Sequence, residues 1–170
     1  NNLEVVDIAD IVILAVKPNI VQAVIDEIKD SAIDKDILII SIAAGVKIKK
    51  IESQLGSHIR VIRAMPNTPA SIMEGVTAIC PNSNAQSNDI ENAKLLFECV
   101  GKIAHINEKD IDIFTALIGS GPAYVFYLIE SLLDSSKNLH LSEQEKKNLL
   151  ASMISGAANL VLNSEDSPNI

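Results

Sequence analysis

The chain has 170 residues, of which 48% are hydrophobic, 21% are charged and only 3% are aromatic. Such a chain can bury a core, which must be built mainly from aliphatic side chains. The formal charge of −8 argues against nucleic acid, whose binding surfaces are basic. No uninterrupted run of about 18 apolar residues predicts a membrane span, and no secretory leader pattern opens the chain.

The first part of the chain predicts alternating strands and helices. The continuous apolar run at residues 11–16 is typical of a parallel strand buried on both faces, and the largely apolar segments 37–42 and 59–62 predict two further buried strands. Between them, apolar residues at helical spacing predict one helix with Asn19 as its N-cap and a shorter one that Gly56 ends. The short links indicate a parallel sheet with right-handed crossovers.

Two more strands and a set of helices follow. Residues 75–80 and 102–106 read as strands, and residues 89–100 as a helix whose inward face is Ile90, Ala93, Leu96, Phe97 and Val100. From Glu108 the pattern is helical, with a break at residues 119–121, Pro122 in a first turn, and a capping box of Ser142 and Glu145. We therefore expect an α/β, Rossmann-like, doubly wound and mostly parallel sheet in residues 1–107. An all-α domain is expected in residues 108–170.

Both ends of the sequence look incomplete. A doubly wound nucleotide domain begins with a strand, a Gly-rich turn and a helix, and no such pattern precedes Ile11. The last predicted helix ends near Asn163 in a polar tail. We expect the natural protein to extend beyond both ends.

Three consecutive predicted strands end in small or polar residues. The segments are 15–18, with Lys17; 42–45, with two alanines and a glycine; and 63–69, with Arg63, Asn67 and Thr68. Ligands of open α/β sheets bind outside the carboxyl ends of the strands, and a small, sparsely polar lining suits a nicotinamide ring. Each segment taken singly also has a plain interpretation. The first can be a solvated lysine, the second a tight turn, and the third a proline-rich turn beside a surface arginine.

The two cysteines, Cys80 and Cys99, are too few for a disulfide framework, and they are not spaced like metal ligands. We read both as buried thiols of a reducing cytosol, which predicts a cytoplasmic protein without a metal site.

In this order, the segments 15–18, 41–45, 63–69 and 119–124 closely resemble pyrroline-5-carboxylate reductase. The resemblance covers essentially the whole chain. It implies a Rossmann domain followed by a helical dimerisation domain, and a homodimer or higher homo-oligomer. It also implies reduction of 1-pyrroline-5-carboxylate to L-proline with NADPH or NADH, the last step of proline biosynthesis.

The resemblance also implies roles for particular residues. The cofactor-binding set is Asn2 at the ribose, Ala15, Val16, Lys17, Pro18, Ile42, Ala43, Ala44 and Asn67. Thr115 and Glu165 match positions near the substrate, and Ser120 is a further hydrogen-bonding candidate there. Glu165 would stabilise the positive ring nitrogen.

Departures from the family pattern leave alternatives open. The N-terminal Gly-rich turn and the C-terminal signature segment of the family are missing, and Ser135 stands where the family usually has glycine or alanine. A hydroxyacid dehydrogenase is one rival, although it needs a lysine that residues 110–121 do not contain. A non-catalytic nucleotide-binding module is the other. The choice between NADH and NADPH stays open.

The helical part carries more apolar surface than one short antiparallel partner can cover. Helices that are apolar on most sides are buried ones, and the commonest closed arrangement is a twofold dimer. The sequence therefore predicts an oligomer.

Overall fold

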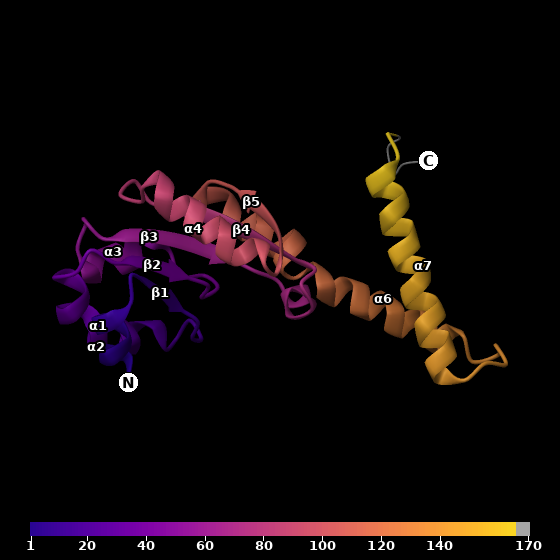
Figure 1. Ribbon diagram of the computed structural model, residues 1–170. Helices are drawn as coiled ribbons and strands as arrows, with labels where there is room; N and C mark the ends of the chain where they lie inside the picture. Colours follow the sequence, from indigo (N-terminus) through magenta and orange to yellow (C-terminus); the bar gives the residue numbers. More distant parts are fainter. Residues whose placement is uncertain (166–170) are drawn as a thin grey trace. The chain divides into compact units, whose positions relative to one another are not determined.

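A computed structural model describes residues 1–165 (Figure 1). The chain divides into two compact units, residues 1–122 and the residues from Ala123 onward. Each unit is described by itself below. The predicted domain boundary after residue 107 stays a prediction; the packing-based division lies after Pro122 because Ile111 and Phe114 belong to the core of the first unit.

The first unit is built on one five-stranded sheet in which the strands follow the order of the chain. The first three strands pair in parallel, the fourth is antiparallel to the third, and the fifth is parallel to the fourth. The expectation of a mostly parallel sheet is confirmed. The strands are β1 (Ile11–Leu14), β2 (Leu38–Ser41), β3 (Arg60–Met65), β4 (Gly75–Pro81) and β5 (Gly101–His105).

Helices cover both faces of this sheet, as its two buried cores show. One core joins α1 (Asn2–Ile8), α2 (Val21–Ile33) and α3 (Ile48–Leu55) to one set of strand side chains. The other joins α4 (Ser87–Glu98) to the alternate set. Because successive side chains of a strand point to opposite faces, a strand covered on both faces is mostly apolar, as β2 is. The expectation that residues 11–16 are buried on both faces is wrong for β1, the outermost strand, in which Ile13 is 45% exposed.

Several local predictions were wrong in detail. The N-cap of α2 is Ile20, which makes no side-chain cap bond, so Asn19 does not cap the helix. Leu96 is 43% exposed and does not face the core; Ala93 and Phe97 do. Cys80 is buried as expected, but Cys99 is exposed, because it follows the last turn of α4.

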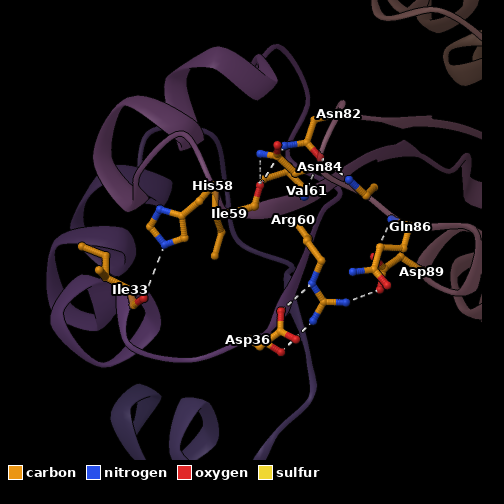
Figure 2. A network of polar contacts seen from close by, with 11 residues as sticks. Ile33, Asp36, His58, Ile59, Arg60, Val61, Asn82, Asn84, Gln86 and Asp89 are labelled. Carbon is orange, nitrogen blue, oxygen red and sulfur yellow. Dashed lines mark hydrogen bonds and ion pairs between the residues drawn. The ribbon is translucent and has the colours of Figure 1, made fainter.

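Asparagine side chains support the start of β3. Asn82 accepts hydrogen bonds at Oδ1 from the amides of Val61 (3.1 Å) and Ala85 (3.0 Å), and its Nδ2 donates to the Ile59 carbonyl at 2.8 Å. Asn84 donates to the same carbonyl at 3.0 Å (Figure 2). These amides satisfy backbone groups that strand pairing leaves free, which buried backbone requires.

The helical continuation begins inside the first unit. It runs through η2 (Glu108–Asp110), α5 (Ile111–Phe114), a π-helical turn η3 (Thr115–Gly119) and α6 (Gly121–Ser135). The expected break at residues 119–121 is a widened π turn followed by a bend at Ser120 rather than an interruption. Pro122 lies in the first turn of α6, as predicted.

The last helix is α7 (Glu143–Asn163), whose N-terminus carries the predicted capping box. The Ser142 hydroxyl accepts from the Glu145 amide at 3.3 Å, and the Glu145 carboxylate accepts from the Ser142 amide at 2.9 Å. The side-chain and then the backbone hydrogen bond from Ser142 lower the pKa of Glu145. Reciprocal capping of this kind fixes where the helix begins.

Within residues 1–165, one helical segment, Glu108–Ser135, is long and apolar enough to cross a membrane by length and composition alone. An uninterrupted apolar run does not predict this segment, because charged and polar residues lie within it. A single segment of this kind is weak evidence, since core helices of soluble proteins pass the same test. Ile111 and Phe114, near the start of this segment, are buried in the core of the first unit. Its most apolar 18-residue window is not buried in the described structure.

Candidate functional site

The three strand ends that the sequence singled out lie side by side. Leu14 pairs with Ser41 and Ser41 with Arg63, and the Ile42 amide donates to the Leu14 carbonyl at 3.2 Å. The loops that follow β1, β2 and β3 therefore leave the sheet at one edge, the carboxyl edge, where open α/β sheets bind ligands.

The loop after β1 borders a hollow that also contains Asn2. This hollow has a volume of about 420 Å³, and apolar side chains of α1, β1 and α2 make up most of its wall, together with Asn2, Ala15 and Val16. Asn2 belongs to α1 and donates from Nδ2 to the Glu27 carboxylate at 2.7 Å. Lys17 and Pro18 follow as exposed residues. Three predicted cofactor residues thus come together at one cavity.

The loop after β2 is a tight turn with an open outer face. The Val46 amide donates to the Ala43 carbonyl at 3.3 Å, and Gly45 has a positive φ of 75°. Ala43 is buried at 4% exposure and Ala44 is exposed. A side chain at Gly45 would meet nothing within 4 Å. The turn can therefore lie against a flat ring at Ala44, whereas Ala43 anchors it in the core.

The loop after β3 is held by Asn67, whose side-chain amide is engaged at both ends. Its Oδ1 accepts from the Val76 amide at 2.9 Å, and its Nδ2 donates to the Ile118 carbonyl at 3.1 Å. Asn67 thus ties the 3-10 turn η1 (Thr68–Ile72), which it precedes, to β4 and to the π turn. The sequence predicted a polar residue here but not these partners.

Thr115 begins the π turn and Ser120 follows it. The Ser120 amide donates to the Thr115 carbonyl at 2.7 Å, a hydrogen bond across five residues. The Thr115 hydroxyl donates to the Ile111 carbonyl at 2.6 Å, so its oxygen lone pairs can accept from another molecule. Ser120 is exposed. π turns inside α-helices are frequent at functional sites.

The π turn lies against the end of β3. A Cβ at Gly119 would come within 3.3 Å of the Met65 methyl and 3.4 Å of the Thr115 methyl. The absence of a side chain at Gly119 allows this approach. Within the first unit, the carboxyl edge of the sheet is therefore directly adjacent to the turn that carries Thr115.

Arg63, expected as a charged residue of the site or a surface arginine, is buried at 3% exposure. It forms ion pairs with Glu108 (3.2 Å) and Asp112 (3.4 Å). Glu108 also accepts from the Ile48 amide at 2.8 Å. Neighbouring Cys80 pairs with Arg63 across β3 and β4. Its burial, and secondarily Glu108, raise the pKa of the Cys80 thiol, while Arg63 lowers it.

Sequence reasoning missed the role of Glu108. The available signal was an arginine inside an apolar strand, which requires a carboxylate partner when buried. Glu108 and Asp112, four residues apart at the start of the helical continuation, supply two. The sequence pattern does not indicate which of the many carboxylates in the chain pairs with Arg63.

Glu165 belongs to the second unit and is exposed, directly after Ser164 at the end of α7. Its predicted role beside the substrate stays a prediction. Among residues 1–165, no three His, Cys, Asp or Glu side chains are placed to hold a metal ion.

Comparison with known families gives two matches. Residues 108–170 match the pyrroline-5-carboxylate reductase dimerisation family, and residues 1–45 match the NADP oxidoreductase, coenzyme F420-dependent family.

Curated relatives carry the same name over nearly the whole chain. The pyrroline-5-carboxylate reductase of Escherichia coli is 38% identical over 165 residues, which are 97% of this chain and 61% of the relative. That of Arabidopsis thaliana is 36% identical over 167 residues, covering 98% of this chain and 60% of the relative. The chain thus spans about three fifths of the length of these relatives.

Solved structures agree with these relatives. Plasmodium falciparum pyrroline carboxylate reductase with NADP bound is 39% identical, with a TM-score of 0.92, covering 98% of this chain and 63% of that one. The Coxiella burnetii pyrroline-5-carboxylate reductase is 36% identical, with a TM-score of 0.88, covering 98% and 62%. A reductive aminase from Aspergillus terreus, at 12% identity and a TM-score of 0.63, shares the fold alone. Along nearly its whole length, this chain is a homologue of the pyrroline-5-carboxylate reductases.

Proposed function

We propose that this protein reduces 1-pyrroline-5-carboxylate to L-proline with a nicotinamide cofactor, the last step of proline biosynthesis. The observation that carries the proposal is the meeting of the carboxyl sheet edge with the π turn of Thr115, through Met65 and Gly119. Homology to enzymes of this name over 97% of the chain supports it. NADPH is the preferred cofactor in this proposal, because the Plasmodium relative binds NADP.

The residues at the sheet edge fit such a cofactor. The β2–α3 turn presents Ala44 and an open Gly45 to a flat ring, and the hollow at Asn2, Ala15 and Val16 offers room beside a mostly apolar wall. Lys17, which is exposed, places a cation where phosphate or ribose would lie. Pro18 and Ile42 shape the two loops, and Asn67 orients the region next to the ring.

The chemistry needs little covalent help. When bound, the reduced nicotinamide would supply a hydride to the imine carbon of the substrate, whose ring nitrogen already carries one proton. The resulting amine then takes a second proton from water and ends as the positively charged nitrogen of L-proline. Catalysis is then mainly positioning and electrostatic support. Thr115 accepts a hydrogen bond from the ring nitrogen through its free lone pairs, because its own proton is donated to Ile111. Ser120 is a further donor, and Glu165 stabilises the positive nitrogen.

We also propose that the protein is a homodimer or higher homo-oligomer in the cytoplasm, with neither nucleic acid nor membrane as a partner. The match of residues 108–170 to a dimerisation family supports the oligomer. The acidic charge of −8 argues against nucleic acid. Two free cysteines are compatible with a reducing compartment.

The test is an assay of the natural protein for oxidation of NADPH or NADH with pyrroline carboxylate. A parallel assay supplies 2-hydroxy acids and the oxidised cofactor. We expect turnover with pyrroline carboxylate only. Turnover with a hydroxy acid favours the dehydrogenase alternative, and cofactor binding without turnover favours a non-catalytic module. Fluorescence microscopy of a tagged natural protein checks the location.

A further inference from the structure

Glu108 joins elements that are far apart in the sequence. One of its oxygens, Oε1, accepts from the Ile48 amide at 2.8 Å and from Arg63 Nη1 at 3.2 Å. Ile48 is the first residue of α3, and the local N-cap residue, Lys47, makes no side-chain cap bond. The first amides of a helix need an acceptor from outside the helix. Glu108 supplies it, although 60 residues separate it from Ile48.

These two contacts connect the two sides of the proposed reaction site. The α3 helix follows the turn of Ala43 and Ala44, which faces the nicotinamide in the proposed function. Glu108 begins the helical continuation that leads to Thr115. Its carboxylate therefore links the turn on the cofactor side to the segment on the substrate side.

Arg63 makes this link a rigid one. It lies on β3, is 3% exposed, and has Asp112 as a second partner at 3.4 Å. Without Glu108, the buried Arg63 would keep only Asp112, whose side chain is 75% exposed, so the loss of the closer carboxylate is unfavourable. Glu108 cannot leave the Ile48 amide without also loosening its hold on Arg63.

We propose that Glu108 is a positioning residue for hydride transfer, which sets the spacing between the Ala43–Ala44 turn and the Thr115 turn. The inference rests on the proposed reductase function. A hydride moves only between closely aligned rings, and a misplacement of about 1 Å can lower the rate on the order of a hundredfold. Glu108 touches neither ring; it acts through the α3 N-terminus and through its own helical segment.

The same strand carries a matched network at its other end. Arg60 begins β3 and pairs with Asp89, which is 2% exposed and caps α4 by accepting from the Gln86 amide at 2.8 Å (Figure 2). Arg60 also donates to the Asp36 carbonyl at 2.6 Å. Asp89 thus resembles Glu108 in making both an ion pair with a strand arginine and a helix-cap hydrogen bond. Unlike Glu108, it lies at the amino ends of the parallel strands.

The experiment compares Glu108→Ala, Glu108→Gln and Asp89→Ala in the natural protein. We expect both alanine variants to lower Tm, since each loses a cap and an ion pair. Only Glu108→Ala should lower kcat on the order of a hundredfold, with a small change in KM for the cofactor. Glu108→Gln should recover part of the loss, because its amide oxygen still accepts from Ile48; it also serves if the alanine variant does not fold.

A second measurement needs no activity. Hydrogen exchange of the Ile48 and Ser120 amides should be faster in Glu108→Ala and unchanged in Asp89→Ala. Equal kcat losses in the two alanine variants, or unchanged exchange at both amides, overturn the positioning role. If the unaltered protein does not reduce pyrroline carboxylate, the proposed function fails, and the exchange result still decides whether Glu108 couples the two turns.

Discussion

At the scale of single residues, side-chain amides and carboxylates take over hydrogen bonds that regular secondary structure leaves open. Asn67 and Asn82 each bind backbone groups at both ends of the side chain. Glu108 caps α3 from 60 residues away, whereas Asp89 caps its own helix, α4, in a local capping box with Gln86. A buried polar group without a partner costs roughly 1–3 kcal/mol, so these residues hold the loops in one conformation.

We predict that Asn67→Ala lowers kcat on the order of a hundredfold while changing the KM for the cofactor little. The variant loses the bonds to Val76 and Ile118, and the loop after β3 then shifts relative to the π turn. Asn67→Asp should not restore the rate, because a carboxylate oxygen would face the Ile118 carbonyl. Steady-state kinetics with varied NADPH measure both constants.

The control for Asn67 is Asn84→Ala, which also loses two side-chain bonds to carbonyls, those of Ser57 and Ile59, at 2.6 and 3.0 Å. These carbonyls lie before β3, away from the carboxyl edge. We expect an unchanged kcat for this control. A full turnover number in Asn67→Ala would make Asn67 a turn residue only.

The Cys80 thiol predicts a pH effect on stability. Burial raises its pKa, so above the ordinary thiol pKa of about 8.5 the unfolded chain loses a proton that the folded chain keeps. The free energy of unfolding then falls as the pH rises, by up to about 1.4 kcal/mol for each pH unit. Urea unfolding on both sides of this pH measures the slope.

The fall in the free energy of unfolding with pH should be less steep in Cys80→Ala. It should stay the same in Cys99→Ala, since Cys99 is exposed. An equal slope in all three proteins would show that Cys80 titrates alike in the folded and unfolded states.

At the scale of elements, the close pairing of β4 and β5 depends on two glycines. Gly75 pairs with Gly101 at the start of the two strands, and Gly101 has a φ of 145°. A Cβ at Gly101 would lie 1.9 Å from the Gly75 carbonyl oxygen. Neither the backbone angle nor the space allows another residue there.

We therefore expect Gly101→Ala to destabilise the protein by at least about 3 kcal/mol, which is the range of severe backbone substitutions. Chemical denaturation gives the value. Lys102→Ala, at the exposed neighbouring position, is the control and should stay within about 0.5 kcal/mol of the unaltered protein. A similar stability for both variants would contradict the contact between the two strands.

At the scale of the whole molecule, the exposed apolar side chains of α6 and α7 require an explanation. Tyr127 is 72% exposed and Leu160 is 73% exposed, and many neighbours on the same helices are exposed as well. Apolar patches larger than a few hundred Å² usually mark an interface. The match of residues 108–170 to a dimerisation family is consistent with such a surface.

We predict that the natural protein is a dimer or larger at low micromolar concentration and that Leu160→Glu weakens this association at least about tenfold. Burying a leucine is worth roughly 1.5–3 kcal/mol, and 1.4 kcal/mol is tenfold in affinity. Light scattering measures the mass. Lys137→Glu, in the exposed turn before α7, should have no effect; a stable, fully active monomer would refute the oligomer.

The sequence by itself determined the features that depend on neighbours along the chain. The buried strand β2, the helix that Gly56 ends and the capping box of Ser142 all follow from local periodicity and local backbone chemistry. The adjacency of the three strand ends also followed, because parallel strands joined by short crossovers must end at one edge.

Only the tertiary structure decided which distant groups meet. The sequence predicts Arg63 as a residue of the site or of the surface, but the structure buries it beside Glu108 and Asp112. Likewise, the partners of Asn67 come from β4 and the π turn, and Cys99 is exposed although the sequence predicts a buried thiol. Most of these contacts join residues more than 40 positions apart. Their geometry depends on how whole elements pack, which local patterns do not encode.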